Sequence, residues 1–267
     1  MIAALLTEYR KLVTTRLWWV LVLGMALYMA FLGAVFAFTY SSAEAAEASG
    51  LGQALSGADL ATTVYGLAPS LGYVFPVVVG ALSMTAEFRH MTITPTFLAE
   101  PRRGVVLVAK LLASIPVGLA FGVAGTVGAV LGGAPTLALR DQGVLLTDPA
   151  VLRTLGLSVI ALAVWCLVGV AFGAVMTNQV AAIVTLLAFT QFVEPLVRLG
   201  LSAVDTLAPI AQWLPGAAGE AIAGASVYGS SGSGTLLSWW AGLLVLIGYG
   251  VVLAAIGRFT TLRRDIT

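Results

Sequence analysis

Apolar runs of about 20 residues recur along the whole chain and limit what it can fold into. A helix of about 20 apolar residues crosses a hydrocarbon core of roughly 30 Å, whereas barrel strands alternate polar and apolar residues over about ten positions. Of the 267 residues, 60% are hydrophobic and only 9% are charged, far from the balance of a soluble domain. The sequence therefore predicts one all-α integral membrane domain over residues 1–267, with six transmembrane helices at about 17–38, 67–86, 105–131, 155–175, 180–199 and 236–256.

Basic residues predict which side of the membrane each connection faces, because cytoplasmic connections carry an excess of Lys and Arg. Three segments hold ten of the 13 basic residues: the N-terminus, the connection between the second and third spans, and the C-terminal tail (Arg10, Lys11, Arg16, Arg89, Arg102, Arg103, Lys110, Arg258, Arg263 and Arg264). Both termini are therefore expected in the cytoplasm. Lys110, near the start of the third span, is expected to snorkel back to the membrane surface.

Polar and small residues predict the structure outside the six spans. Residues 1–16 combine an apolar helical face with a polar side that carries Glu8, Arg10 and Lys11, followed by Arg16. This pattern predicts an amphipathic helix in the membrane interface; an ordinary helical lead-in is the alternative. Residues 40–66 and 133–152 predict two outer loops. Residues 200–235 contain two apolar pieces too short to cross, which predicts short helices that enter the outer leaflet and return.

Residues 87–103, EFRHMTITPTFLAEPRR, form the only internal segment in which charged residues, a His and two Pro lie tightly between two apolar runs. A short charged connection bounded by prolines has little slack, so it can pass a displacement from one span to the next. A merely solvated loop that obeys the positive-inside pattern would have the same charges.

Glycines and prolines inside the spans bear on packing and movement. Pro69 and Pro76 lie in the second span, where proline removes a helical hydrogen bond and usually kinks the helix. Such a kink is either a hinge or a purely structural feature. Three glycine pairs spaced by four residues predict close helix–helix approach: Gly118 and Gly122, Gly128 and Gly132, and Gly169 and Gly173.

Polar residues near the end of the fifth span predict a site at the outer side of the membrane. Gln191, Glu194 and Arg198 share one helical face, with Glu194 and Arg198 in i, i+4 register. Two interpretations stay open: a polar gate or substrate contact at the outer end of a transport path, or a structural ion pair that makes both charges tolerable near the interface.

The residues that most enzymes need are almost absent. The chain has one His and one Cys, and it lacks the HExxH, GxSxG and GxxxxGK[ST] patterns of zinc, serine and ATP sites. Neither catalytic nor metal-ligating residues are therefore predicted, and a net charge of +1 gives no argument for nucleic acid. Any energy input must come from an ion gradient or another protein. The lack of ionisable residues near the bilayer midplane disfavours an ion-coupled carrier.

Taken in order along the chain, these features resemble the permease subunits of type-two ABC exporters, the ABC-2 membrane family. The resemblance is carried by TEYRKLVTTR before the first span, AEFRHMTITPTFLAEPRRGVVLVAK after the second, the tight TNQ turn, the EP of the fifth span, WLP before the sixth span and the RRD tail. It covers essentially the whole chain and leaves the substrate open. One departure is Met91, which stands where the family often has a Gly before the Thr.

The resemblance implies a six-helix half-transporter in a bacterial-type cytoplasmic membrane. It implies pairing with an identical or sister permease, and two separately encoded ATPase subunits that hold ATP and Mg. A coupling helix would contact the ATPase. That role falls to Glu87, Arg89, His90, Thr92, Thr94, Pro101, Arg102 and Arg103.

The expected function is export of an amphipathic or lipid-like compound: a drug, antibiotic, lipid or peptide. Candidate residues of the path or outer gate are Phe75, Pro76, Phe189, Gln191, Glu194 and Arg198. The alternatives are a non-transporting immunity or scaffold protein in the membrane, and an ion-coupled carrier.

Overall fold

The computed structural model describes residues 2–49, 54–204, 206–227 and 236–263, and within these ranges the chain forms helices and connections without a strand. Two short π-helical segments, η1 (Ala68–Gly72) and η2 (Phe189–Val193), interrupt the series. The α-helices are α1 (Ile2–Thr14), α2 (Leu17–Tyr40), α3 (Ala43–Ser49), α4 (Gly57–Tyr65), α5 (Val74–Arg89), α6 (Ile93–Ala99), α7 (Arg103–Leu139), α8 (Pro149–Val175), α9 (Gln179–Ala188), α10 (Glu194–Ser202), α11 (Ala208–Ala211), α12 (Pro215–Ala223) and α13 (Trp239–Phe259).

Six of the described helices are long and apolar enough to cross a membrane, as the sequence predicts. They are Leu17–Tyr40, Gly57–Arg89, Arg103–Leu139, Pro149–Val175, Gln179–Ser202 and Trp239–Phe259, so the chain has the fold of a multi-pass helical membrane protein. The second of these joins α4, η1 and α5, and the fifth joins α9, η2 and α10.

The prediction of loops over 40–66 and 133–152 is wrong for the parts of these segments that form helix, in α3, α4 and the ends of α7 and α8. Helix α4 forms because its apolar face is buried, with Leu60, Val64 and Tyr65 inaccessible to solvent. Helix α7 continues to Leu139, and α8 begins early because the Asp148 side chain accepts a hydrogen bond from the Ala150 amide at 2.8 Å. Hydropathy marks the apolar core of a span, whereas packing and caps set where its helix ends.

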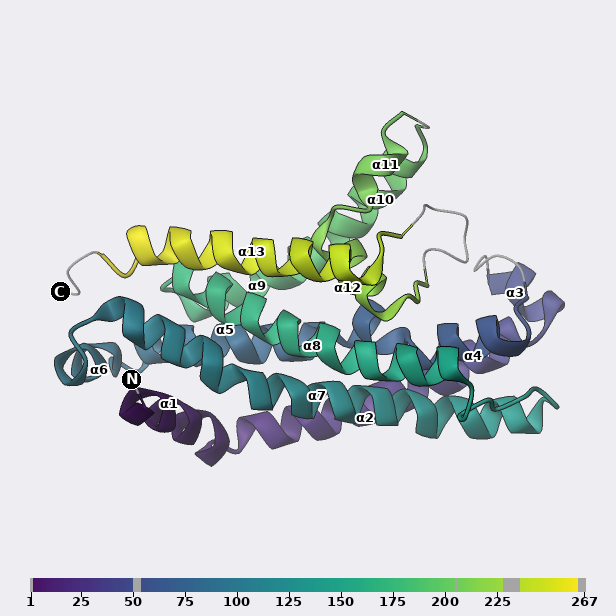
Figure 1. The fold of residues 1–267 in the computed structure, drawn as a ribbon, viewed down its shortest axis with the longest axis horizontal. Helices are drawn as coiled ribbons and strands as arrows, with labels where there is room; N and C mark the ends of the chain where they lie inside the picture. Colours follow the sequence, from purple (N-terminus) through teal and green to yellow (C-terminus); the bar gives the residue numbers. More distant parts are fainter. Residues whose placement is uncertain (1, 50–53, 205, 228–235, 264–267) are drawn as a thin grey trace.

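Helix α8 occupies the centre of the arrangement, packed against α5, α7 and α13, while α2 packs along α7 (Figure 1). The predicted close approach of glycine-bearing helices is confirmed. Gly118 and Gly122 face α8, Gly128 and Gly132 face α2, and Gly169 and Gly173 face α5. A Cβ at position 122 would lie 2.8 Å from the Cα of Val159, so a larger residue there would push the two helices apart.

Both prolines of the second span are buried, and the helical hydrogen-bond pattern changes to π-helical around Pro69, while Pro76 lies in the first turn of α5. A second π-helical segment, η2, interrupts the fifth span. The hydroxyl of Tyr73 donates to the carbonyl of Thr190 at 3.0 Å and so joins the two distorted regions. The Tyr73 ring also stacks on Trp165 of α8, with ring centroids 4.4 Å apart.

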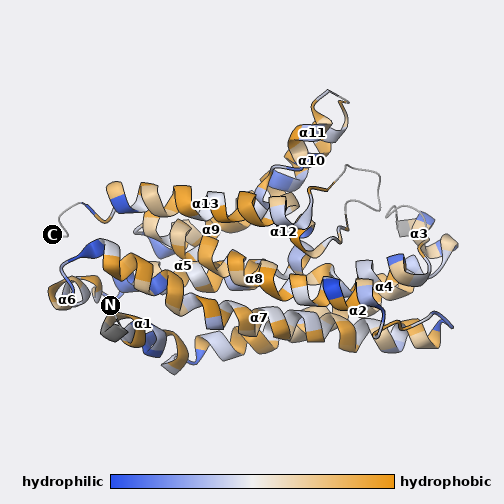
Figure 2. Ribbon diagram, viewed as in Figure 1, coloured by the Kyte–Doolittle hydropathy of each residue, from blue (hydrophilic) through white to orange (hydrophobic). Residues whose placement is uncertain are grey.

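Helices α1 and α6 and the last turn of α13 lie together at one end of the molecule, on the left in Figure 1. We call this the basic end, because nine described Lys and Arg residues lie on these elements, on the adjoining ends of α5 and α7 and on the connections beside them: Arg10, Lys11, Arg16, Arg89, Arg102, Arg103, Lys110, Arg258 and Arg263. Figure 2 shows hydrophilic residues there beyond the largely hydrophobic helices. The remaining tail residues, including Arg264, lie outside the described residues.

Short helices precede the last span, as expected. Helices α10 and α11 lean away from the other helices (Figure 1), whereas α12 packs against α8 and α13 with all of its residues buried. Helix α12 ends at Gly224, whose φ of 71° is the left-handed conformation that favours glycine. The predicted SSGSG linker at 230–234 lies outside the described residues.

Candidate functional site

The connection after the second span contains a short helix, α6, and begins with a tight turn. The chain leaves α5 at His90, and the amide of Thr92 donates to the carbonyl of Glu87 at 2.9 Å. Met91 has a φ of 55°, in the left-handed region that glycine adopts without cost. The turn thus gives a physical reason for a glycine preference at this position, and Met91 accepts the strain.

Helix α6 has one face on the molecule and one face free. Ile93 is buried, and Phe97 lies under the Arg103 guanidinium at 5.1 Å from the ring centroid. On the other side, Met91 and Leu98 have exposed fractions of 69% and 78%, with Thr94 also exposed between them. Met91 lies in the turn before α6 and Leu98 near its end, so two apolar side chains are left exposed at a polar surface, as is typical of a contact site.

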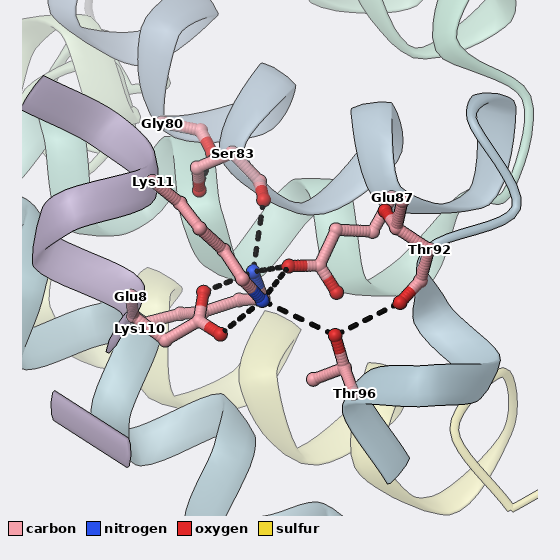
Figure 3. Close-up of polar contacts among 8 residues, drawn as sticks. All are labelled: Glu8, Lys11, Gly80, Ser83, Glu87, Thr92, Thr96 and Lys110. Atoms are coloured by element: carbon pink, nitrogen blue, oxygen red, sulfur yellow. Dashed lines mark hydrogen bonds and ion pairs between the residues drawn. The ribbon is translucent and has the colours of Figure 1, made fainter. Parts of the chain in front are cut away.

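Four charged side chains from three helices form a cluster next to α6, in which Glu8, Glu87 and Lys110 are buried and Lys11 is partly exposed (Figure 3). Lys110 of α7, only 2% exposed, lies 2.5 Å from Glu8 of α1 and 2.6 Å from Glu87 of α5. Lys11 of α1 lies 2.7 Å from Glu8 and 2.8 Å from Glu87. We call Glu8, Lys11, Glu87 and Lys110 the ion cluster. Its formal charge is zero, which is what a desolvated site requires.

The ion cluster reaches α6 through Thr96, whose hydroxyl oxygen accepts a hydrogen bond from Lys11 at 3.1 Å and donates to the Thr92 carbonyl at 2.9 Å. Lys110 also donates to the carbonyl of Ser83 at 3.1 Å. Polar contacts therefore connect α1, α5, α6 and α7. A movement of α6 would disturb the Lys11–Thr96 hydrogen bond and, through Lys11, the contacts with Glu8 and Glu87.

The protonation of Lys11 follows from two opposing effects. Desolvation is the largest and lowers the pKa of Lys11, but hydrogen bonds and charge interactions with Glu8 and Glu87 outweigh it, so the pKa lies above its ordinary value. Lys11 is thus held in the charged form that the two carboxylates need.

The structure brings only some of the predicted coupling residues into the ion cluster. Glu87 is buried there, whereas Arg89, His90, Thr92, Thr94, Pro101 and Arg102 are exposed. Arg102 forms an ion pair with Glu100 at 2.9 Å, and this hydrogen bond lowers the pKa of Glu100. Arg103 donates to the carbonyl of Leu262 at 2.5 Å, which attaches the start of α7 to the chain after α13.

The charged residues predicted for the interface helix α1 also fall into two groups. Glu8 and Lys11 turn inward to the ion cluster, while Arg10 and Arg16 are exposed. The expectation that Lys110 snorkels to the surface is wrong, because Glu8 and Glu87 offer it carboxylate partners inside the protein. Sequence reasoning missed this partnership. The signal was a Lys on the apolar side of a span and two Glu residues on neighbouring segments.

A second polar cluster lies near the C-terminal end of the fifth span, away from the basic end. Arg198 donates to both carboxylate oxygens of Glu220 at 2.9 and 2.8 Å, and Glu220 also accepts a hydrogen bond from Ser226. Glu194 accepts from the Gly216 amide at 2.5 Å, in the first turn of α12. The bidentate partner of Arg198 is thus Glu220 on α12. The i, i+4 spacing of the sequence had instead predicted an ion pair between Arg198 and Glu194. Nothing in the local sequence pattern identified Glu220.

The remaining candidate path residues are spread over two spans. Phe75 is half-buried beside the ring of Tyr28, with centroids 5.8 Å apart, and Pro76 is buried. Phe189 and Gln191 are exposed on the fifth span. Among the described residues, no group of three or more His, Cys, Asp or Glu side chains is placed to hold a metal ion.

The fold and the ion cluster define a multi-pass helical membrane protein with a polar, helix-bearing connection at its basic end. No protein-family model matches the chain, and no curated protein matches it significantly in sequence.

Proposed function

We propose that this chain is the permease subunit of an ATP-driven exporter, in which separate ATPase subunits act on the basic end. The observation that carries the proposal is the ion cluster, which connects α6 and α1 to the ends of two long spans. The order of sequence features along the chain, similar to that of type-two ABC exporter permeases, supports the same function.

Helix α6 has the properties of a force-receiving element. Its free face presents Thr94 and Leu98 to a partner, with Met91 exposed in the turn before it, and its inner face is held by Ile93 and by Thr96. A partner that closes on ATP would push α6, and the ion cluster would pass this movement to α1, α5 and α7. Buried ion pairs suit this role because they have few alternative arrangements and hold a defined geometry.

The cargo we propose is an amphipathic or lipid-like compound moving outward beside the second and fifth spans. Both spans contain a π-helical segment, and such segments are frequent at functional sites because they leave helical hydrogen bonds easier to rearrange. The hydrogen bond from Tyr73 to Thr190 links these segments, so both can move together. The Arg198–Glu220 pair then marks the outer end of the path.

The test is ATPase activity of the reconstituted complex with and without cargo. Arg102→Glu and Leu98→Asp change exposed residues of the connection, and Glu87→Lys changes the ion cluster. We expect all three variants to insert in the membrane and to lose cargo stimulation, while Arg153→Glu at the opposite end retains it. Full stimulation in Arg102→Glu and Leu98→Asp would reject this connection as the coupling element.

Co-purification separates this function from the immunity or scaffold alternative. An exporter subunit is expected to be recovered with a protein that contains a phosphate-binding loop. Recovery of the chain alone, without nucleotide-dependent activity, would favour a non-transporting role. Transport that stops when the ion gradient is collapsed, with ATP intact, would favour the ion-coupled carrier.

A further inference from the structure

A cleft of about 990 Å³ lies at the basic end, between the start of α7 and the end of α13. It is separate from the ion cluster and shares no lining residue with it. Its walls combine four arginines with apolar side chains: Pro101, Arg102, Arg103, Gly104, Val105, Val108, Arg258, Phe259 and Arg263. The cleft thus has a strongly positive side and an apolar side.

Within the described residues, two of the four arginines differ from the others in having no partner. Arg102 is paired with Glu100, and Arg103 donates to the Leu262 carbonyl. For Arg258 and Arg263, the described part of the chain provides neither an ion pair nor a hydrogen-bond acceptor. Four guanidinium groups around one cleft repel one another, and Glu100, which is paired with Arg102, offsets only part of that charge. An anion in the cleft would relieve this repulsion.

Gly104 gives the cleft its space beside Arg258. A Cβ at position 104 would lie 3.1 Å from Nε of Arg258, so a larger residue would displace this guanidinium. The planar fork of arginine donates two parallel hydrogen bonds to phosphate oxygens, which a lysine cannot match. An all-arginine lining is therefore suited to a phosphate group.

The apolar walls indicate where that phosphate comes from. Val105 and Val108 belong to α7 and Phe259 to α13, both of which are transmembrane helices, and Phe259 is 70% exposed. The ends of helices that span a membrane lie near the level where phospholipid headgroups meet acyl chains. A free phosphate ion would use only the arginines, whereas a phospholipid would use both sides of the cleft.

We propose that this cleft binds the headgroup of an anionic phospholipid from the leaflet at the basic end. The phosphate would lie among Arg102, Arg103, Arg258 and Arg263, with the acyl chains along Val105, Val108 and Phe259. A zwitterionic lipid fits worse because its ammonium group would enter a site that is already positive. This site shares Arg102 and Arg103 with the ATPase contact proposed above, whereas Arg258 and Arg263 belong to the cleft alone.

Native mass spectrometry of the full-length protein tests the site, by titration with phosphatidylglycerol and with phosphatidylcholine of the same chains. We expect preferential binding of phosphatidylglycerol. Arg258→Gln and Arg263→Gln should each weaken it about fivefold, and the double variant about thirtyfold, from the typical contribution of one basic residue near an anionic membrane surface. Both residues lie outside the ion cluster and α6, so these variants leave the proposed coupling element unchanged.

Arg10→Gln is the matched control, because Arg10 is an exposed arginine of the basic end that does not line the cleft. This variant should bind phosphatidylglycerol as the wild type does. Equal weakening in Arg10→Gln would show general attraction to the basic end and would overturn the site, as would equal binding of the two lipids. Inorganic phosphate in tenfold excess should leave the lipid bound; its displacement would assign the cleft to free phosphate instead.

Discussion

Replacing Lys110 by Met tests whether the ion cluster holds the basic end together. The substitution keeps an unbranched side chain of similar length and removes the charge. In the wild type, the Lys110 ammonium lies 2.5 Å from Glu8 and 2.6 Å from Glu87, and the Lys110 side chain is 2% exposed. After the change, two buried carboxylates share Lys11, whose side chain is 39% exposed and therefore screened by solvent.

The expected cost of Lys110→Met is about 3–5 kcal/mol, the usual penalty for removing one partner of a buried ion pair. A domain of a few hundred residues loses about 2–4 °C in Tm for each kcal/mol, so we expect a drop of about 10 °C. Lys11→Met, at a half-exposed position, should cost about 1 kcal/mol or less. Adding Glu87→Gln to Lys110→Met removes one charge of each sign, and it should recover a large part of the loss.

The assay is thermal unfolding of the purified protein in nanodiscs, combined with hydrogen exchange of α1. Lys110→Met should lower Tm and remove the protection of α1 amides, because α1 is held by this contact. If Lys110→Met costs no more than Lys11→Met, or if the double variant is less stable than Lys110→Met alone, the ion cluster does not hold the basic end together.

Three further predictions concern other parts of the structure. Gly169→Leu should destabilise by about 1–3 kcal/mol in thermal unfolding, because Gly169 lies against the backbone of Val77, whereas Gly156→Leu faces open space and should be close to neutral. Glu220→Gln should lower Tm clearly, because Arg198 loses its buried carboxylate partner, and Glu44→Gln at an exposed position should leave Tm unchanged. Because the pKa of Lys11 is raised, its stabilising effect is complete below the ordinary lysine pKa of about 10.4 and is lost as pH rises through the raised value. The difference in Tm between wild type and Lys11→Met should therefore be constant from neutral pH to about pH 10 and vanish in stronger alkali; a constant difference at every pH would contradict the assignment.

The six spans could be predicted from the sequence because a lipid environment demands about 20 apolar residues in each helix. The glycine pairs could be predicted for a similar reason, since a residue without Cβ allows two backbones to meet whichever helix is opposite. Gly128 shows the limit of this reasoning. Its spacing predicted a close contact, but only the structure shows that the contact is with α2.

The polar clusters could be predicted only in part. Glu87, Glu8 and Lys11 belonged to segments with a polar pattern, but their meeting point depends on how α1 folds back against α7. Lys110 lies in an apolar run, where snorkelling and burial with a partner have the same local sequence. The helix over Gly57–Tyr65 and the continuation of α7 to Leu139 were missed because hydropathy does not report tertiary burial, here of α4 and of Leu137.

The central claim is that an ATPase subunit contacts the free face of α6. Incorporation of a photo-crosslinking residue, Leu98→p-benzoylphenylalanine, tests it directly, because Leu98 is 78% exposed on that face. The same change at Leu152, exposed on α8 at the opposite end, serves as the control. We expect position 98, and not position 152, to crosslink to a protein identified by mass spectrometry as having a phosphate-binding loop. Absence of such a protein at position 98, or its capture from position 152 instead, would contradict it.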